Sequence, residues 1–253
     1  MSEKSILFDV HCHLHAEELF QQLEAVLSQA RTKNIHVIGV SMDVDSSRQT
    51  IEIARRNPDV YAAVGLHPWN VETSTPVEAI AALLRARRKE IIALGEVGLD
   101  HTFVKDQKRW KAQELALEQL IDLAKTFKLP LITHGKGVES GLVEFLINAG
   151  AEEVVLHWFV GSEPAVTQAL DAGYYFSVTP AISFQTQLRK VVELVPLNRL
   201  MLESDGPVRY KKLQGQPSVV PLVAAEIARI KQVSEEEVVK MATQTAKQFF
   251  RIS

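Results

Sequence analysis

Short apolar runs alternate with longer segments of helical periodicity along the whole chain. The short runs are rich in β-branched and aliphatic residues, a composition that favours strands. The clearest helical pattern covers Asp106–Phe127, where apolar residues recur on one face. The alternation predicts eight strands, at Ser5–Asp9, Ile35–Val40, Val60–Val64, Ile91–Leu94, Leu131–Thr133, Val154–Leu156, Tyr174–Ser177 and Arg199–Leu202.

Strands that alternate with helices form parallel βαβ units, and eight such units can close into a barrel. A (β/α)8 TIM barrel typically needs about 250 residues, and the chain has 253. We therefore expect an α/β protein with one (β/α)8 barrel. An open doubly wound sheet remains an alternative because periodicity does not reveal whether a sheet closes. No linker or low-complexity tract divides the chain, which predicts a single domain over residues 1–253.

The segment after the last predicted strand lacks the barrel's alternation. Glu203–Gln216 is rich in glycine and charge, and we expect a long loop there. Two C-terminal helices follow. The last one is expected to begin at Ser234, because Glu237 three residues later completes the pattern of a capping box.

Composition narrows the class of protein. With 46% hydrophobic residues, the chain can bury a sizeable core. Its net charge of −3 lacks the basic excess of a non-specific duplex binder, so contact with nucleic acid should be local. A single cysteine, Cys12, excludes an intrachain disulfide. No apolar stretch is long enough for a signal peptide or a membrane helix. We expect a soluble, cytoplasmic protein without membrane contact, and no obligate protein partner is evident.

Metal-binding residue types recur where the predicted strands end. In a barrel, the carboxyl ends of all strands meet at one mouth, where active sites of this fold lie. Histidines placed by chance would not coincide with the predicted strand ends this consistently. The pattern therefore predicts one polar site, formed by His11, His13, His67, Glu96, His134, His157 and Asp205.

Each of these signals is weak when taken alone. On an extended strand, His11 and His13 can point to the same ion while Cys12 faces the helices, but an isolated HxH is more often structural. Glu96 lies between glycines, where it could bridge two divalent ions or brace a loop. Asp205 begins a turn, and Glu203 is an equal candidate for the functional acid.

Two groups of basic residues differ in their expected position. Arg85–Lys89 ends a helix before the fourth strand, on the face opposite the site, and we do not interpret it as a nucleic-acid patch. Arg209, Lys211 and Lys212 follow Asp205 near the expected mouth. They are candidates for contacts to phosphate, with a solvated loop as the equal alternative.

Taken together, these motifs resemble those of the TatD family of amidohydrolase-like metallohydrolases. They occur in the family's order and span nearly the whole chain. The matching segments are Phe8–Leu14, Gly65–Pro68, Gly95–Asp100, the segment around His134, His157–Ser162 and Glu203–Pro207.

The resemblance implies a barrel with two divalent metal ions and metal-dependent hydrolysis of DNA, including 3′→5′ exonuclease action. If the family's metal ligands are assigned to the matching positions of this chain, one ion would be held by His11, His13, Glu96 and Asp205. The second ion would be held by Glu96, His134 and His157, with Glu96 as the bridge. The expected partner is therefore DNA, with single strands or ends preferred.

The chain departs from the family pattern near the expected substrate. Lys136 stands where an arginine is common, and a lysine offers a point charge instead of a bidentate fork. Trp158 replaces a cysteine, and its indole could stack on a base or fill the pocket. Gln216 and Thr245 also differ from the usual residues. The metal ligands are all kept, so the substrate is less firmly indicated than the metal site.

These residues suggest a mechanism as a hypothesis. Two ions about 3.5–4 Å apart would polarise a phosphodiester and activate a water molecule. Glu96 and Asp205 are the expected catalytic residues, with Asp205 as the general base. His67 (if protonated), Lys136 and Arg209 are expected to neutralise charge on the phosphate, beside Trp158 as a further substrate contact.

The metal and the substrate stay open at this point. The imidazole-rich donor set suits Zn²⁺ or Mn²⁺, whereas Mg²⁺ is the ion usual in the family. Two other functions remain as alternatives. One is a metal-dependent hydrolase that acts on a different ester or amide. The other is a metal-binding protein without catalytic activity.

Overall fold

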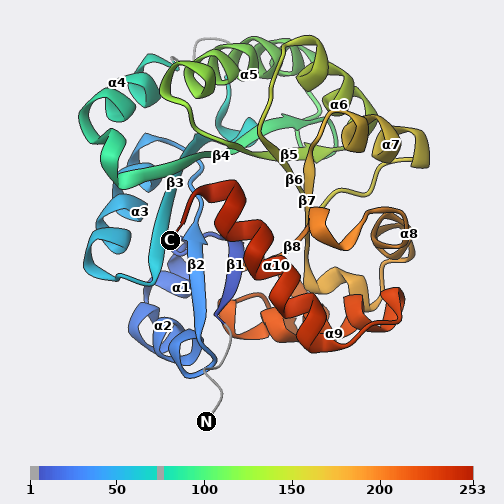
Figure 1. The fold of residues 1–253 in the computed structure, drawn as a ribbon. Helices are drawn as coiled ribbons and strands as arrows, with labels where there is room; N and C mark the ends of the chain where they lie inside the picture. The colour runs from blue at the N-terminus through green and yellow to red at the C-terminus, as the bar shows by residue number, and fades with distance from the viewer. Residues whose placement is uncertain (1–5, 73–76, 253) are drawn as a thin grey trace.

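Eight parallel strands form one sheet in chain order (Figure 1). The computed structural model describes residues 6–72 and 77–252. Each strand pairs with the next one along the chain, which confirms the TIM barrel, because a doubly wound sheet would reverse its strand order. The strands are β1 (Leu7–Cys12), β2 (Ile35–Gly39), β3 (Val60–Leu66), β4 (Ile91–Asp100), β5 (Leu131–Lys136), β6 (Val154–His157), β7 (Tyr175–Val178) and β8 (Leu200–Leu202).

The seam between β8 and β1 closes beyond the end of β8. The backbone N–H of Asp205 donates to the carbonyl oxygen of His11 over 2.9 Å, and that of His13 donates to Gly206 over 2.8 Å. On the same seam, the buried carboxylate of Asp9 accepts from the backbone N–H and the hydroxyl of Ser204, at 2.9 and 2.6 Å. A side chain therefore supplies part of the hydrogen bonding that strand pairing supplies elsewhere in the barrel.

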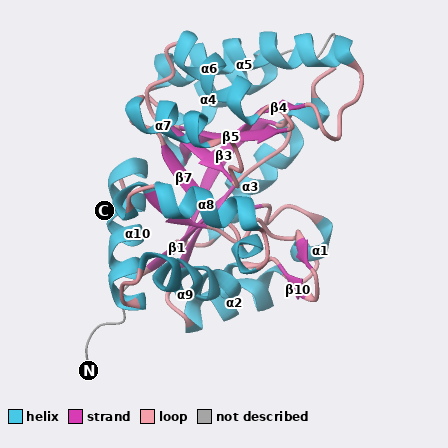
Figure 2. Ribbon diagram, turned by 90° about the vertical axis from the view of Figure 1, so that its right-hand side faces the viewer, coloured by secondary structure: helices cyan, strands magenta, loops and turns pink. Residues whose placement is uncertain are grey.

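Helices surround the barrel and cover its outer face (Figures 1 and 2). Most are amphipathic, with the apolar face toward the strands. The predicted helix at Asp106–Phe127 is confirmed as α5, with Asp106 as its N-cap. The helices are α1 (Glu17–Phe20), α2 (Leu23–Thr32), α3 (Val44–Arg56), α4 (Glu78–Arg87), α5 (Gln107–Phe127), α6 (Glu139–Asn148), α7 (Glu163–Asp171), α8 (Thr186–Leu194), α9 (Val220–Lys231) and α10 (Glu235–Phe250).

The last helix, α10, closes one end of the barrel, across the front of Figure 1. It begins where the sequence predicts, because the Ser234 hydroxyl accepts a hydrogen bond from the backbone N–H of Glu237 over 3.1 Å. Its apolar face packs against side chains that fill the barrel interior. This cluster of buried residues comprises Phe8, Val10, Ile38, Val40, Ala63, Ala93, Ile132, Val155, Met201, Ala246, Phe249 and Phe250. The functional end is therefore the opposite one, where α1 and β10 lie in Figure 2.

Several strands run further than the apolar pattern predicts. The expectation that His11, Glu96, His134 and His157 follow their strands is wrong, because each lies within one. The backbone of His134 and His157 still belongs to the parallel ladder, whereas His11 and Glu96 lie at irregularities in the register of their strands. Hydropathy therefore underestimates strand length wherever a strand ends in functional residues. Ser5, the predicted start of the first strand, lies outside the described residues.

The expected long loop at 203–216 contains a small antiparallel hairpin. Its strands are β9 (Arg209–Tyr210) and β10 (Leu213–Gln214), and it stands beside the mouth. Tyr210 is buried, and its hydroxyl donates a hydrogen bond to the carbonyl oxygen of Ser204 over 3.1 Å. The hairpin is therefore attached to the seam that closes the barrel.

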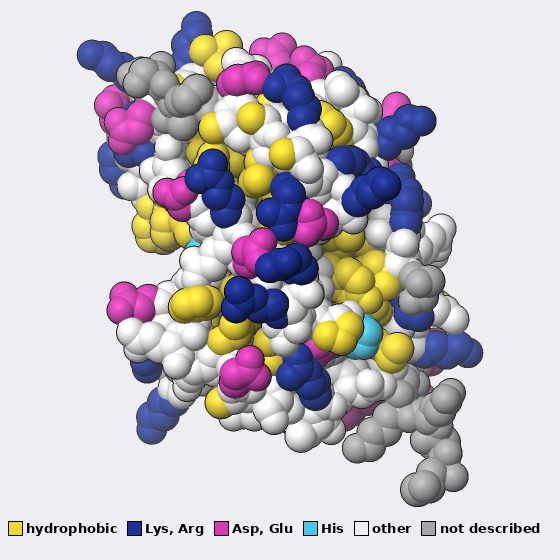
Figure 3. Space-filling view, turned by 90° about the vertical axis from the view of Figure 1, so that its left-hand side faces the viewer, with side chains coloured by type: hydrophobic (Ala, Val, Ile, Leu, Met, Phe, Trp, Pro, Cys, Tyr) yellow, Lys and Arg dark blue, Asp and Glu magenta, His cyan; other side chains and the backbone are white. Residues whose placement is uncertain are grey.

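The outer face over α2, α3 and α4 mixes basic and acidic side chains (Figure 3). Arg87, from the basic cluster at 85–89, pairs with Glu52 at 3.1 Å and also with Glu90. These pairs interrupt the positive charge, as expected for a solvated face. Within the described segments, no helix combines the length and the apolar character needed to cross a membrane.

Candidate metal centre

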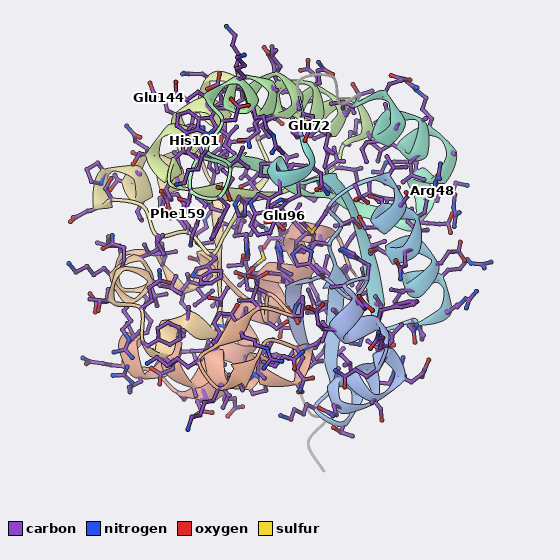
Figure 4. The ribbon with its side chains drawn as sticks, turned by 180° about the vertical axis from the view of Figure 1, so that it is seen from behind. Arg48, Glu72, Glu96, His101, Glu144 and Phe159 are labelled. Carbon is purple, nitrogen blue, oxygen red and sulfur yellow. The ribbon has the colours of Figure 1, made fainter. Side chains whose placement is uncertain are left out.

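Glu96 lies near the centre of the ring of strands when the molecule is seen from behind (Figure 4). Glycines allow the strands around it to approach closely, as the sequence suggested. Gly98, at φ 147°, would place an added Cβ 2.0 Å from the carbonyl oxygen of His134, and a Cβ on Gly65 would lie 2.4 Å from that of Glu96. The register of β4 against β5 is also irregular between Leu94 and Val97. Such irregularities redirect side chains, and this one falls where Glu96 enters the mouth.

One oxygen of the Glu96 carboxylate faces the first pair of histidines. Its Oε2 lies 3.3 Å from Nε2 of His11 and 3.2 Å from Nε2 of His13. Asp205 approaches the same two nitrogens from the segment after β8, with Oδ1 at 3.6 and 3.7 Å. Cys12 points away and packs among apolar residues of the helix layer. The HxH segment therefore places both imidazoles on one side of the strand.

The other oxygen of Glu96 faces two different histidines. Its Oε1 lies 2.9 Å from Nδ1 of His134 and 3.4 Å from Nε2 of His67. Nε2 of His134 lies 2.9 Å from Oδ2 of Asp100. Burial alone would lower the pKa of His134, but its hydrogen bonds to Asp100 and Glu96 raise it to about 9. The two carboxylates therefore hold the ring of His134 between them.

His67 can be assigned a tautomer from its surroundings. Its Nδ1 accepts a hydrogen bond from the backbone N–H of Trp69 over 3.2 Å, so that nitrogen carries no proton. Burial lowers the pKa of His67, which keeps the ring neutral at pH 7. The remaining proton is then on Nε2, the nitrogen that faces Glu96. His67 is arranged as a hydrogen-bond donor, and the expectation of a protonated His67 is not supported.

His157 enters the site between two acids. Its ring stacks on His11 with centroids 3.7 Å apart, and its Nε2 lies 3.7 Å from Oδ2 of Asp205. Its Nδ1 lies 2.9 Å from Oε1 of Glu203, which also accepts from the backbone N–H of Trp158 over 3.2 Å. Asp205 thus faces the cluster, while Glu203 lies behind His157.

The electrostatics of the cluster fit a bound cation. Burial lowers the pKa of His11 to about 4 and that of His157 to about 3, so both rings are neutral, the form that ligates metals. Burial and then the negative charge of Glu96 raise the pKa of Asp205 well above its usual range. A divalent ion among these donors would offset that repulsion. Three sets of donor atoms lie within 4.8 Å of one another: His11, His13 and Asp205; His11, Glu96 and His157; and His67, Glu96 and His134.

A cavity of about 500 Å³ opens onto the cluster and reaches the protein surface. Lys136 and Trp158 line it, and the Lys136 ammonium lies 4.5 Å from the centroid of the Trp158 ring. The indole N–H of Trp158 donates to Gln185 over 2.8 Å, which fixes the ring in the wall. Arg209 is exposed on β9 and is not among the lining residues. The predicted site residues thus line this cavity except Arg209 and His11, and His11 is buried against Glu96 and His157.

Sequence reasoning missed three residues at this site. Asp100 accepts from His134, and Trp69 and Phe103 line the outer part of the cavity. Asp100 ends the glycine-flanked Glu96 segment, and Trp69 follows His67 by two positions, so proximity to a motif was the available signal. No pattern in the sequence marked Phe103.

Comparisons with known proteins agree with this geometry. The profile of a family described as TatD related DNase matches residues 8–251. An uncharacterized metal-dependent hydrolase of Bacillus subtilis, YabD, is 30% identical and covers 98% of this chain and 100% of its own length. The human deoxyribonuclease TATDN3 is also 30% identical, covering 96% of this chain and 94% of its own.

A solved structure shares the fold over nearly the whole length. It is YjjV, a TatD homologue from Escherichia coli K12, with a TM-score of 0.90 and 24% identity. The alignment covers 98% of each chain. The family profile and the curated relatives thus extend over the segments that carry the site. The chain belongs to the TatD related DNase family.

Proposed function

We propose that this chain is a divalent-metal-dependent phosphodiesterase that hydrolyses DNA, with single-stranded ends as its preferred substrate. One observation carries the proposal. Imidazole and carboxylate donors from β1, β4, β5, β6 and the end of β8 converge on the two oxygens of Glu96 at the base of an open cavity. The family name and the name of the human relative point to DNA as the substrate.

Two groups of donors would hold the metal ions. The donor atoms of His11, His13 and Asp205 are close enough to hold one ion, and by the family resemblance His134 and His157 would hold the other, with Glu96 shared between them. Bound divalent ions would supply Lewis-acid polarisation of a phosphoryl oxygen and a lowered pKa for water. The preponderance of imidazole suits Zn²⁺ or Mn²⁺ on grounds of ligand softness. His67 stays outside both groups because its Nε2 carries the proton.

Asp205 is the residue best placed to accept a proton from the attacking water. Its oxygens lie 3.6–3.7 Å from the ring nitrogens of His11, His13 and His157, longer than a direct hydrogen bond. The N–H of Asp205 donates to His11, which anchors the backbone of the carboxylate at the seam. Asp205 is therefore anchored within the group that would hold an ion and is not hydrogen-bonded to the rings of these histidines, which leaves it available to accept the proton of a nearby water.

Two further side chains would act on the phosphate. Lys136 places a positive charge in the wall of the cavity, where it can neutralise charge on a non-bridging oxygen. The Nε2–H of His67 can donate to a phosphate oxygen as a neutral group. Arg209 lies outside the cavity lining, so we leave it out of the mechanism.

The test combines metal analysis with a nuclease assay. The purified protein is assayed on end-labelled single-stranded oligonucleotides with Mg²⁺, Mn²⁺ and Zn²⁺, beside His11→Ala and the isosteric Glu96→Gln. We expect metal-dependent release of nucleotides by the natural chain and a loss of at least 100-fold in both variants. No release with any of the ions would contradict the proposal.

A second candidate is hydrolysis of another ester. The outer cavity is lined largely by apolar side chains, among them Met42, Trp69 and Val208, which would also suit an apolar acyl or aryl group. This candidate would be favoured if the protein hydrolysed lactones, phosphotriesters or aminoacyl esters in the presence of the same metal ions and released no nucleotides from oligonucleotides. If the metal-loaded protein hydrolysed none of these substrates, a metal-binding role without catalysis would be indicated.

A further inference from the structure

Two exposed aromatic side chains stand on one wall of the cavity. Trp69 is 43% exposed on the short helix at Pro68–Asn70, and Phe103 is 63% exposed on the loop between β4 and α5. Their rings meet edge to face with centroids 5.3 Å apart, and both line the cavity that contains Glu96. Large apolar side chains at the rim of a polar site indicate contact with a ligand.

The Trp69 ring and the backbone of Phe103 are held by the same carboxylate that holds His134. Asp100 accepts the indole N–H of Trp69 over 2.7 Å and the backbone N–H of Phe103 over 2.6 Å. Arg109 donates to the carbonyl oxygen of Trp69 over 2.6 Å. The Trp69 ring is therefore fixed relative to the metal centre, and the Phe103 ring, anchored through its backbone, packs against it. A rigid aromatic surface loses little conformational entropy when a planar group stacks on it.

We propose that Trp69 and Phe103 form a stacking surface for the nucleobase adjacent to the phosphate under attack. This inference rests on the proposed nuclease function and specifies how the substrate is bound. The Trp69 ring lies 6.4 Å from that of His134, so a base at this wall belongs to a nucleotide next to the metal centre. Stacking uses the π face that every base has, so it grips DNA without selecting a sequence.

The charge of the site favours binding of DNA by base stacking over binding by ionic contacts to its phosphates. Apart from the proposed metal ions, which would act on the phosphate under attack, Lys136 is the one lysine or arginine among the described residues that line this cavity, and the net charge of the chain is −3. Binding through phosphate contacts alone would require several more cations. A base in a duplex is already stacked and paired, whereas a base in a single strand can leave its neighbours. The surface thus accounts for a preference for single strands or frayed ends.

Phe103 is the better residue to substitute, because a change at Trp69 would also remove the hydrogen bond from its indole N–H to Asp100. Phe103→Ala is expected to raise KM for a single-stranded oligonucleotide about 5- to 100-fold, with kcat changed less than twofold. Phe103→Trp should restore the KM. Phe184→Ala removes an aromatic ring of 41% exposure that does not line the cavity, and it should leave KM unchanged.

An abasic substrate separates stacking from a structural effect. When the nucleotides near the cleaved bond lack their bases, the natural chain and Phe103→Ala should show the same KM. A salt titration of binding should also give a shallow slope, equivalent to about one or two phosphate contacts. An equal loss on abasic and normal substrates, or an equal loss in Phe184→Ala, would overturn the stacking surface.

The outcomes also separate this inference from the function on which it rests. If the natural chain cleaves oligonucleotides and Phe103→Ala cleaves them with the same KM, the stacking surface is wrong and the nuclease function stands. If the natural chain cleaves no oligonucleotide with Mg²⁺, Mn²⁺ or Zn²⁺, the nuclease function fails, and the stacking surface fails with it.

Discussion

Asp100 accepts a hydrogen bond from Nε2 of His134 over 2.9 Å and thereby directs the other ring nitrogen, Nδ1, to Glu96. A histidine that ligates a metal through one nitrogen commonly donates its other N–H to a carboxylate, which fixes the tautomer and orients the ring. Asp100 is in turn held by Trp69, Thr102 and Phe103. One buried acid therefore connects the metal centre to the rim of the cavity.

Removal of this acid should weaken metal binding. We expect Asp100→Ala to lower the affinity for the ion at His134 about 10- to 100-fold, because the imidazole loses its orienting partner. Titration calorimetry with Mn²⁺ measures the change. Asp45→Ala, which removes an exposed acid on α3, serves as the matched control. Unchanged affinity in Asp100→Ala would show that the ring is held by packing alone.

Glu96 should be indispensable for the second ion. Its two oxygens face two separate groups of histidines, so no other described carboxylate can take its place between them. We expect Glu96→Ala to retain at most one ion per chain and to lose hydrolysis. Elemental analysis of the purified variant gives the stoichiometry. A variant that still holds two ions would contradict the bridging role.

The metal-free protein should lose stability as pH rises above neutrality. Without metal, the hydrogen bonds to Asp100 and Glu96 outweigh the effect of burial and raise the pKa of His134 to about 9, against 6.5 for a free imidazole. Its ionised form thus stabilises the fold fully below pH 6.5, and this contribution is lost as pH rises through about 9. We expect the Tm of the chelated protein to fall between pH 6.5 and 9.

The variant His134→Gln isolates this contribution. It cannot ionise, so its Tm should depend less on pH across the same interval. Saturation with metal should also reduce the dependence, because binding requires the neutral ring and displaces the proton. A chelated natural chain whose Tm is constant from pH 6.5 to 9 would show that His134 is not protonated there.

Gly98 should tolerate no side chain. Its φ is 147°, and a Cβ would lie 2.0 Å from the carbonyl oxygen of His134. Gly98→Ala is expected to lower the free energy of unfolding by about 1–3 kcal/mol through crowding, in addition to the backbone strain. Gly173→Ala is a suitable comparison, since its φ is 81° and no atom lies within 4 Å of the added Cβ. Chemical denaturation of both variants separates crowding from strain, and equal losses would argue against crowding.

The sequence by itself determined the order of the elements and the position of the polar site. Alternating periodicity predicted eight strands and the helices between them, including the one over Asp106–Phe127, and the capping box at Ser234 marked a helix start correctly. These signals are local, because apolar spacing and N-cap side chains act within a few residues of each other. Hydropathy failed at the strand ends, where β4 and β5 continue through polar residues such as Glu96 and His134.

Only the tertiary structure decided how those residues meet. Closure of the barrel depends on Asp9 and Ser204, which are 195 positions apart, and the tautomer of His67 follows from one backbone N–H. The connection of Asp100 to both His134 and Trp69, and the place of Phe103 at the rim, also join different loops and strands. Most of these contacts join residues that are far apart in the sequence. They form only when the sheet closes, so the spacing of residues along the chain does not predict them.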